Sequence, residues 1–404
     1  MSSRSIANRR WVGCLFGLSL VVAPLGVTMA NEVVNLARPE IIKTELFRSG
    51  HADYQSYRIP SLAITRQGTL LAAVAGRFDG HGDWGNIDIM LRRSTDGGKT
   101  WDEQRVVADD GANTVDNATF IIDPQSDTIY LMYQINYSRA YLKESTDEGV
   151  NWSPPHEITA VFDEFRTRDG YNWEVIAMGP GHGITTQTGR MLVPVWLATH
   201  RRHRPSISAT VYSDDQGKTW QAGEIIVANN ERTVNPSEHM LVELADGRIM
   251  ANIRTESKPH RRLMSVSENG ATAWTEPEFV EELYEPICMA GFTTATPGDD
   301  SGDQVLLFSH PNSGPSAPAY DPEWGARARR NLTLRVSRDQ GARWDDGLVI
   351  ESGPSAYSAI AGSGDGYVYI LYETGSNKEH GAFAPRGIVL AKISLAELLA
   401  HGAE

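Results

Sequence analysis

The chain has 404 residues, a formal net charge of −14 at pH 7 and two cysteines. A chain this acidic is a poor candidate for binding nucleic acid, which attracts positively charged surfaces. Its length suits either two ordinary domains or one large repeat fold.

Residues 1–30 have the three-part pattern of a secretory signal peptide. Three arginines precede an apolar run from Trp11 to about Val22, and small residues follow up to Ala30. The run is short for a membrane span, and a retained single-span anchor is the alternative interpretation. We expect cleavage near Ala30, which would send a soluble mature chain to the periplasm or the medium. Cys14 would leave with the signal peptide, so Cys288 has no partner for an intrachain disulfide.

A turn residue followed by a short apolar run of β-forming residues occurs six times along the mature chain. The steps between successive copies are 56 to 63 residues, and the turn residues are Gly68, Asp127, Gly189, Gly247, Asp303 and Gly366. Units of this length and composition are typical of propeller blades. The sequence therefore predicts an all-β fold, a six-bladed β-propeller with four-stranded antiparallel blades.

A second repeat has the frame S-x-D-x-G-x-x-W. Its serines are Ser94, Ser145, Ser213 and Ser337, and a degenerate copy begins at Ser267. Each copy follows a turn residue by 18 to 34 positions, which places it between the third and fourth strands of a blade. We expect its aspartate to hydrogen-bond its own loop and its tryptophan to pack between sheets.

Strand parity then assigns each segment to one end of the ring. The turn between strands 1 and 2 and the box between strands 3 and 4 share one pole. The start of strand 1 and the loop between strands 2 and 3 lie at the other pole, roughly 20 Å away. No linker divides residues 31–404, so we expect one domain, closed by a short helix from Ile393.

Chemically active side chains gather at the pole opposite the boxes. The start of strand 1, the end of strand 2 and the loops before strand 3 together supply two loop aspartates, three arginines, two glutamates and a tyrosine: Arg58, Asp79, Asp83, Glu238, Arg254, Arg329, Tyr357 and Glu373. Because the inner strands of a propeller face its central channel, these groups can converge.

At this point the sequence resembles the bacterial exo-α-sialidases (neuraminidases), which carry Asp-box (BNR) repeats. The resemblance rests on "YRIPSL", "GHGDWGNIDIMLRRS", "GPGHGI", "SEHMLVELADGRIMANIRTES", "RRNLTLRVS" and "SAYSAI", which occur in the family's order. It covers nearly all of residues 31–404. It implies a sialidase-like propeller that removes terminal α-linked sialic acid from glycoproteins, glycolipids or oligosaccharides.

The resemblance also implies a role for each matching residue. The three arginines that bind the substrate carboxylate are Arg58, Arg254 and Arg329, although Arg330 is adjacent to the last. Tyr357 is the nucleophile and Glu238 its activating base. Asp83 is the acid and base, with Asp79 as its competitor. Supporting residues are Glu373, which steadies Arg58, together with Arg77 and Asp79.

These residue types suit an anionic sugar. Guanidinium groups bind a carboxylate with two parallel hydrogen bonds and keep their charge. A carboxylate nucleophile would meet the substrate carboxylate with a repulsion of about 4 kcal/mol at 4 Å, whereas a phenol arrives neutral. A tyrosine nucleophile sets sialidases apart from most glycosidases. No metal or cofactor is needed for these steps, and none is expected.

Other residues are assigned more modest roles. Trp173 and Met178 are expected to line a pocket for the acetamido group. The basic runs "THRRHRPS" and "KPHRRL" are expected to be solvated loops, His182 a core or loop histidine, and Asp88 a structural residue of a third strand. A propeller that binds sialoglycans without cleaving them, a trans-sialidase and an anhydrosialidase remain as alternative functions.

Overall fold

The computed structural model describes residues 38–80, 82–297, 303–317, 327–377 and 383–401. The chain divides into two units, Met1–Leu36 and Ala37–Glu404, and every described residue lies in the second. The expected signal peptide, residues 1–30, lies outside the described residues. No helix among the described residues has the length and apolar character needed to span a membrane.

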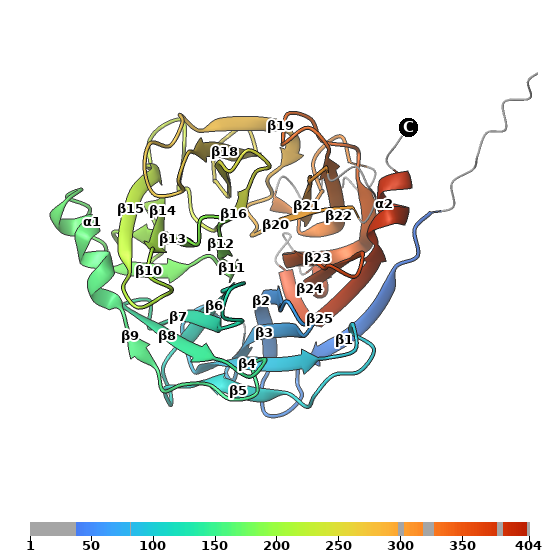
Figure 1. The fold of residues 1–404 in the computed structure, drawn as a ribbon, viewed down its shortest axis with the longest axis horizontal. Helices are drawn as coiled ribbons and strands as arrows, with labels where there is room; N and C mark the ends of the chain where they lie inside the picture. The colour runs from blue at the N-terminus through green and yellow to red at the C-terminus, as the bar shows by residue number, and fades with distance from the viewer. Residues whose placement is uncertain (1–37, 81, 298–302, 318–326, 378–382, 402–404) are drawn as a thin grey trace, which may run out of the picture. The chain divides into compact units, whose positions relative to one another are not determined.

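The second unit is all-β and propeller-like, with its sheets set radially around a centre (Figure 1). Two sheets have four strands in chain order. The first contains β2 (Ser56–Ile64), β3 (Leu70–Arg77), β4 (Ile87–Ser94) and β5 (Arg105–Ala108). The other contains β16 (His239–Glu243), β17 (Ile249–Ile253), β18 (Arg261–Ser267) and β19 (Glu278–Tyr284).

Two further sheets have five strands each because short segments are added. One contains β6 (Val115–Ile122), β7 (Ile129–Ile135), β8 (Arg139–Ser145), β9 (His156–Glu157) and β11 (Gly181–His182). The next contains β10 (Val175–Met178), β12 (Ile184–Thr185), β13 (Met191–Ala198), β14 (Ser206–Ser213) and β15 (Gln221–Val227).

The "GPGHGI" segment explains these additions. Between β10 and β12, β11 leaves its own sheet and pairs in parallel with β6. The Gly183 amide donates to the Phe120 carbonyl oxygen at 2.8 Å, and a Cβ on Gly183 would meet the Leu192 carbonyl at 2.5 Å. Only glycine allows this close approach of three strands.

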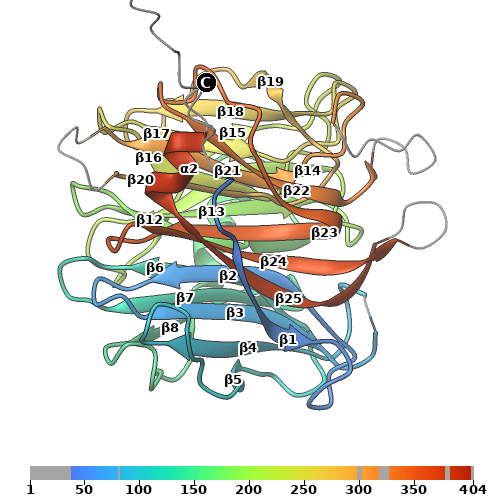
Figure 2. The ribbon, with the colours of Figure 1, turned by 90° about the vertical axis from the view of Figure 1, so that its right-hand side faces the viewer.

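The last sheet has seven strands and joins the two ends of the described chain. Its order is β1 (Ile42–Arg48), β25 (Phe383–Ser394), β24 (Tyr367–Asn377), β23 (Leu348–Gly362), β22 (Arg330–Ser337), β21 (Val305–Pro311) and β20 (Gly291–Ala295). Figure 2 shows β1 alongside β25. The expected division into six four-stranded blades is therefore seen as four separate sheets and one larger sheet.

Helices are few among the described residues. A 3-10 turn (Thr159–Phe162) leads into α1 (Asp163–Thr167), and α2 (Leu395–His401) follows β25. The predicted closing helix is confirmed and begins two residues after Ile393. Leu395 and Leu398 of α2 pack into a buried cluster with residues of the seven-stranded sheet.

Both predicted repeats have the expected place in the sheets. Each turn residue lies one or two positions before the second strand of a unit, and those at Gly68, Asp127, Gly189, Gly247 and Gly366 have positive φ angles from 57° to 88°. Each of the five boxes joins a third strand to the strand that follows. The Thr65 hydroxyl donates to the Glu148 carboxylate at 2.5 Å, so a turn and a neighbouring box share one pole, as parity predicts.

The first box shows why its residues recur. Asp96 accepts hydrogen bonds from the Lys99 and Thr100 amides at 3.1 and 2.9 Å and from the Thr100 hydroxyl at 2.6 Å. These bonds lower the pKa of Asp96 to about 2. Trp101 packs against the buried cluster between the first and last sheets, which confirms the structural role expected for the box. Asp88, in β4, accepts a hydrogen bond from the Tyr54 hydroxyl at 2.6 Å, in keeping with its structural assignment.

Replacing Asp96 by alanine is expected to lower Tm by a few degrees at neutral pH, because the box loses its hydrogen-bond acceptor. A lowered pKa stabilises the fold above the ordinary aspartate pKa, and this contribution is lost as the pH falls through about 2. The difference in Tm between the two proteins should therefore stay constant above about pH 5 and shrink as the pH falls from about 4 towards about 2. Calorimetry measures both, with Lys99→Ala as the control in the same loop. A pH-independent difference would contradict this origin.

Candidate active site

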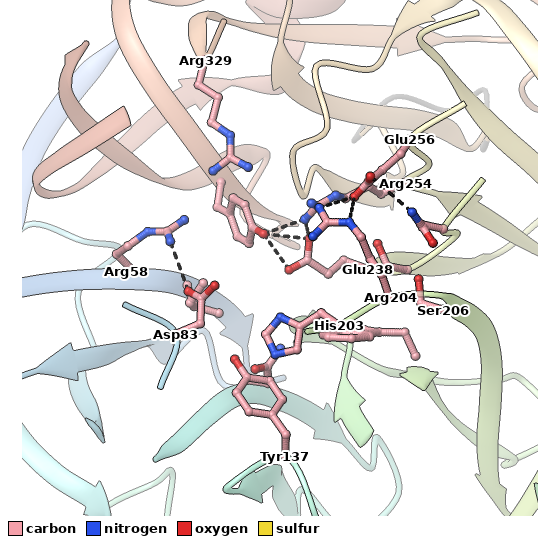
Figure 3. A pocket seen from close by; sticks show the side chains of 16 residues that line it. Arg58, Asp83, Tyr137, His203, Arg204, Ser206, Glu238, Arg254, Glu256 and Arg329 are labelled. Atoms are coloured by element: carbon pink, nitrogen blue, oxygen red, sulfur yellow. Dashed lines mark hydrogen bonds and ion pairs between the residues drawn. The ribbon is translucent and has the colours of Figure 1, made fainter. Parts of the chain in front are cut away.

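One cavity of about 270 Å³ lies at the pole opposite the boxes. Six of the sequence-predicted site residues line it: Arg58, Asp83, Glu238, Arg254, Arg329 and Tyr357. They come from β2, β23 and the segments next to β3, β16, β17 and β22. Figure 3 shows the guanidinium groups of Arg58, Arg254 and Arg329 pointing into the cavity from three directions. Strand parity thus brings together side chains that are up to 299 positions apart in the sequence.

Tyr357 and Glu238 are in direct contact. The Tyr357 hydroxyl lies 2.7 and 2.9 Å from the two carboxylate oxygens of Glu238. Nη1 of Arg254 donates to the same hydroxyl at 2.7 Å and also to the Glu238 carboxylate. A phenol, a carboxylate and a guanidinium therefore form one compact group.

The environment keeps this phenol protonated in the free protein. Burial raises the pKa of Tyr357, Arg254 lowers it and Glu238 raises it. The resulting pKa lies well above the usual value for a tyrosine. The guanidinium carbons of Arg58 and Arg329 lie 5.1 and 5.2 Å from the centre of the Tyr357 ring. A phenol this hard to ionise needs a base in contact before it can react as a nucleophile, and the carboxylate of Glu238 is in contact with it.

Arg58 is held by a fully buried carboxylate. Its Nε and Nη2 donate to Glu373 at 3.1 and 3.3 Å. Glu373 also accepts the backbone amides of Ile59 at 2.9 Å and of Tyr357 at 3.3 Å. Ile59 has a φ of 57°, a strained value for a β-branched residue, at the point where the β2–β3 register shifts. The contact with Glu373 offsets this strain and fixes Arg58 relative to Tyr357.

Asp83 faces the cavity, whereas Asp79 is exposed and is not among the residues that line it. The Asp83 carboxylate lies 3.1 Å from Nη1 of the buried Arg77 and 3.6 Å from Nη1 of Arg58. Burial raises the pKa of Asp83, but Arg77, Arg58 and His203 outweigh it and lower the pKa overall. Arg77 also contacts the buried carboxylate of Asp116 at 3.4 Å. Burial raises the pKa of Asp116 to about 6, although the charge of Arg77 acts in the opposite direction.

Arg329 and Arg330, which the sequence leaves as competitors, lie differently. Nη2 of Arg329 donates to the Ile287 carbonyl oxygen at 2.7 Å, and its side chain lines the cavity. Arg330 is the first residue of β22 and is absent from the lining. The geometry supports Arg329 as the third arginine of the site.

Comparison with known proteins agrees with this geometry. The sequence profile of the BNR repeat-like domain matches residues 68–370. A sialidase of Micromonospora viridifaciens is 30% identical over 414 residues, covering 94% of this chain and 60% of that relative. The chain belongs to the sialidase family with BNR repeats.

Other members and structures extend the comparison. A sialidase of Bacteroides fragilis is 27% identical over 360 residues, covering 81% of this chain and 61% of that relative. The chain therefore spans about three fifths of the length of these two relatives. The structure of a Hadza microbial sialidase has a TM-score of 0.73 at 25% identity, covering 88% of this chain and 69% of that chain. A leech intramolecular trans-sialidase, at 17% identity and a TM-score of 0.72, shares the fold; the match covers 89% of this chain and 71% of that chain.

The sequence prediction missed more than half of the residues that line this sialidase-family site. The missed residues are Asn117, Tyr137, Trp196, His203, Arg204, Ser206, Asn235, Ser237 and Glu256. Arg204 donates to the Glu256 carboxylate at 2.8 Å, and Glu256 also accepts from the Asn235 side chain at 3.3 Å. His203, Arg204 and Glu256 follow second strands, so the parity that located Asp83 could have located them.

Three expectations for this region are wrong. Trp173 and Met178 do not line the cavity; they are buried in the core between two sheets, and the Trp173 indole donates to the Phe162 carbonyl at 2.8 Å. The run "THRRHRPS" is not simply solvated, because His203 and Arg204 line the cavity. In "KPHRRL", Arg262 is buried in β18 and pairs with the buried Glu285.

His182 does not belong to a metal cluster among the described residues, where no group of three or more His, Cys, Asp or Glu side chains has a suitable arrangement. Burial lowers the pKa of His182 to about 4. Its imidazole is therefore neutral at pH 7.

Replacing Glu373 by alanine is expected to lower the free energy of unfolding by about 3 kcal/mol, because Arg58 loses its buried partner. Glu351→Ala is a matched control, since Glu351 pairs with Lys43 on the surface at 2.9 Å. That exposed pair should contribute less than about 1 kcal/mol. Urea denaturation measures both values. Equal losses in the two variants would contradict the role assigned to Glu373.

Proposed function

We propose that this protein is an exo-α-sialidase that hydrolyses terminal α-linked sialic acid with retention of configuration. The observation that carries the proposal is the contact of the Tyr357 hydroxyl with both oxygens of Glu238, inside a cavity lined by three converging arginines. The sialidase names of the relatives support the same activity.

Substrate binding would rest on Arg58, Arg254 and Arg329. A sialic acid carries a carboxylate on its anomeric carbon, and planar guanidinium groups match a carboxylate in charge and geometry. Their local field explains how a chain with a net charge of −14 could bind an anion. With the carboxylate so held, the anomeric carbon would lie against the Tyr357 hydroxyl.

In the first step, the Tyr357 oxygen would attack the anomeric carbon while Glu238 takes the phenol proton. Asp83 would donate a proton to the glycosidic oxygen as its bond to the sugar breaks. The asialo product leaves with that proton, and the sugar remains bonded to Tyr357. The carboxylate of the substrate would offset the charge of Arg58 near Asp83, which favours the protonated form that the acid needs.

In the second step, Asp83 would remove a proton from water, which attacks the anomeric carbon. The Tyr357 oxygen leaves and recovers its proton from Glu238. Two inversions give net retention. Every group returns to its starting protonation state, so the cycle needs no further reactant.

The fold and the location of the protein complete the proposal. We propose that the seven-stranded sheet is two blades, because β23 pairs with β22 up to Pro354 and with β24 from Ser355. The second blade then consists of β23, β24, β25 and β1, which brings the total to six.

We also propose that residues 1–30 are removed near Ala30 and that residues 31–404, the catalytic domain, are periplasmic or secreted.

Replacing Tyr357 by phenylalanine is expected to lower kcat by at least roughly a hundredfold, because the nucleophilic oxygen is removed. Release of sialic acid from a fluorogenic sialoside measures the rate, and proton NMR of the first product separates hydrolysis from transfer and from anhydro-sugar formation. Tyr130→Phe is a control, since the Tyr130 hydroxyl bonds to the Gln216 carbonyl in a box. Undiminished turnover in Tyr357→Phe would refute the tyrosyl intermediate.

Replacing Asp83 by asparagine tests which aspartate is the acid. For sialyllactose, whose leaving group must be protonated, kcat/KM should fall by roughly 10²- to 10⁴-fold. For an aryl sialoside the loss should be much smaller, because a phenolate leaves without a proton. Asp79→Asn should change neither rate. The opposite result, with Asp79→Asn as the damaged variant, would assign the acid role to Asp79.

A further inference from the structure

Trp84 is an exposed aromatic ring beside the proposed acid. Among the described residues, the exposed large hydrophobic side chains are Ile42, Trp84, Val106 and Val150, and Trp84 is the aromatic one, with 45% of its surface exposed. It directly follows Asp83 in the loop between β3 and β4. An exposed tryptophan next to a catalytic cavity is a candidate for ligand contact.

The ring is held in place by residues that line the cavity. Its centroid lies 4.6 Å from that of Tyr137 and 5.4 Å from that of His203, with which it is nearly parallel at 28°. His203 in turn lies 4.6 Å from Tyr137 and 5.3 Å from Trp196. Tyr137 and Trp196 are buried, so the stack runs from the core to the surface and ends at Trp84. The ring is thus supported by Tyr137 and His203 while almost half of the side-chain surface stays exposed.

The place of Trp84 follows from the chemistry of its neighbour. An acid must lie within hydrogen-bonding distance of the oxygen that it protonates, so the departing group lies on the Asp83 side of the cavity. Figure 3 shows Arg329 at one end of the cavity and Tyr137 with His203 at the other. Tyr137 and His203, which line the cavity together with Asp83, pack on the Trp84 ring, so the ring lies at this end of the cavity. The first unit beyond the scissile bond would therefore lie at Trp84.

We infer that Trp84 forms a subsite for the first sugar of the leaving group, so the preferred substrates are sialylated oligosaccharide chains. A pyranose presents a face of C–H groups that packs on an aromatic ring, while its hydroxyl groups stay in water. This inference rests on the proposed sialidase activity and adds a contact outside the part of the cavity that holds sialic acid.

The test compares sialyllactose with methyl α-sialoside. Both leaving groups must be protonated, but methanol is too small to reach Trp84. In Trp84→Ala, kcat/KM for sialyllactose should fall about tenfold, mainly through KM, while kcat/KM for the methyl sialoside stays unchanged. Trp84→Phe keeps a ring and should retain most of the wild-type value. Val106→Ala, at an exposed hydrophobic residue of β5, should change neither rate.

The outcomes separate the subsite from the activity itself. Equal losses with both substrates would overturn the subsite and show that Trp84 only supports the Asp83 loop. No loss with either substrate would also overturn it. If the wild-type protein released sialic acid from neither substrate, the proposed function would fail first.

Discussion

The buried carboxylate of Glu373 is the contact on which the site depends. It accepts the Arg58 guanidinium and the backbone amides of Ile59 and Tyr357. Arg58 and Ile59 belong to β2, the first strand of one sheet, and Tyr357 belongs to β23 of the seven-stranded sheet, and these two strands are in contact. A carboxylate with no exposed surface is stable only when such partners surround it. The same carboxylate therefore joins two neighbouring sheets, orients Arg58 and fixes the backbone of Tyr357.

Several residues around the same cavity have strained backbone conformations. Ile59, Asn117, Tyr137, His203 and Asn235 line it and have positive φ angles between 46° and 63°. Such conformations cost of order 1 kcal/mol each and persist where neighbouring contacts enforce them. The boxes at the other pole also contain left-handed residues, such as Glu148 and Gln216, but there the aspartate of the same loop holds the turn by hydrogen bonds. At the cavity, contacts between sheets do this, as when Glu373 accepts the Ile59 amide.

The fold could be predicted from the sequence because its signals are local and repeated. A left-handed turn residue before the second strand and a self-bonded box after the third are set by residues a few positions apart. Counting strands from these marks assigned Arg58, Asp83, Glu238, Arg254, Arg329 and Tyr357 to one pole, and the structure places them in one cavity. Two features escaped the count: β11 of "GPGHGI" pairs with a different sheet, and β20–β25 join β1 in one seven-stranded sheet.

The sequence by itself determined the strand order, the pole that each loop occupies and the residue types available for binding an anion. Only the tertiary structure decided which residue of two competing pairs faces the cavity. Asp83 lines it and Asp79 does not, and Arg329 lines it and Arg330 does not. Residues so close in sequence have the same place in the strand count and differ only in the direction of their side chains. It also decided that Trp173 lies in the core and that Tyr137, His203 and Trp84 stack beside Asp83. Those contacts join residues from different sheets, and no local pattern records which of them will meet.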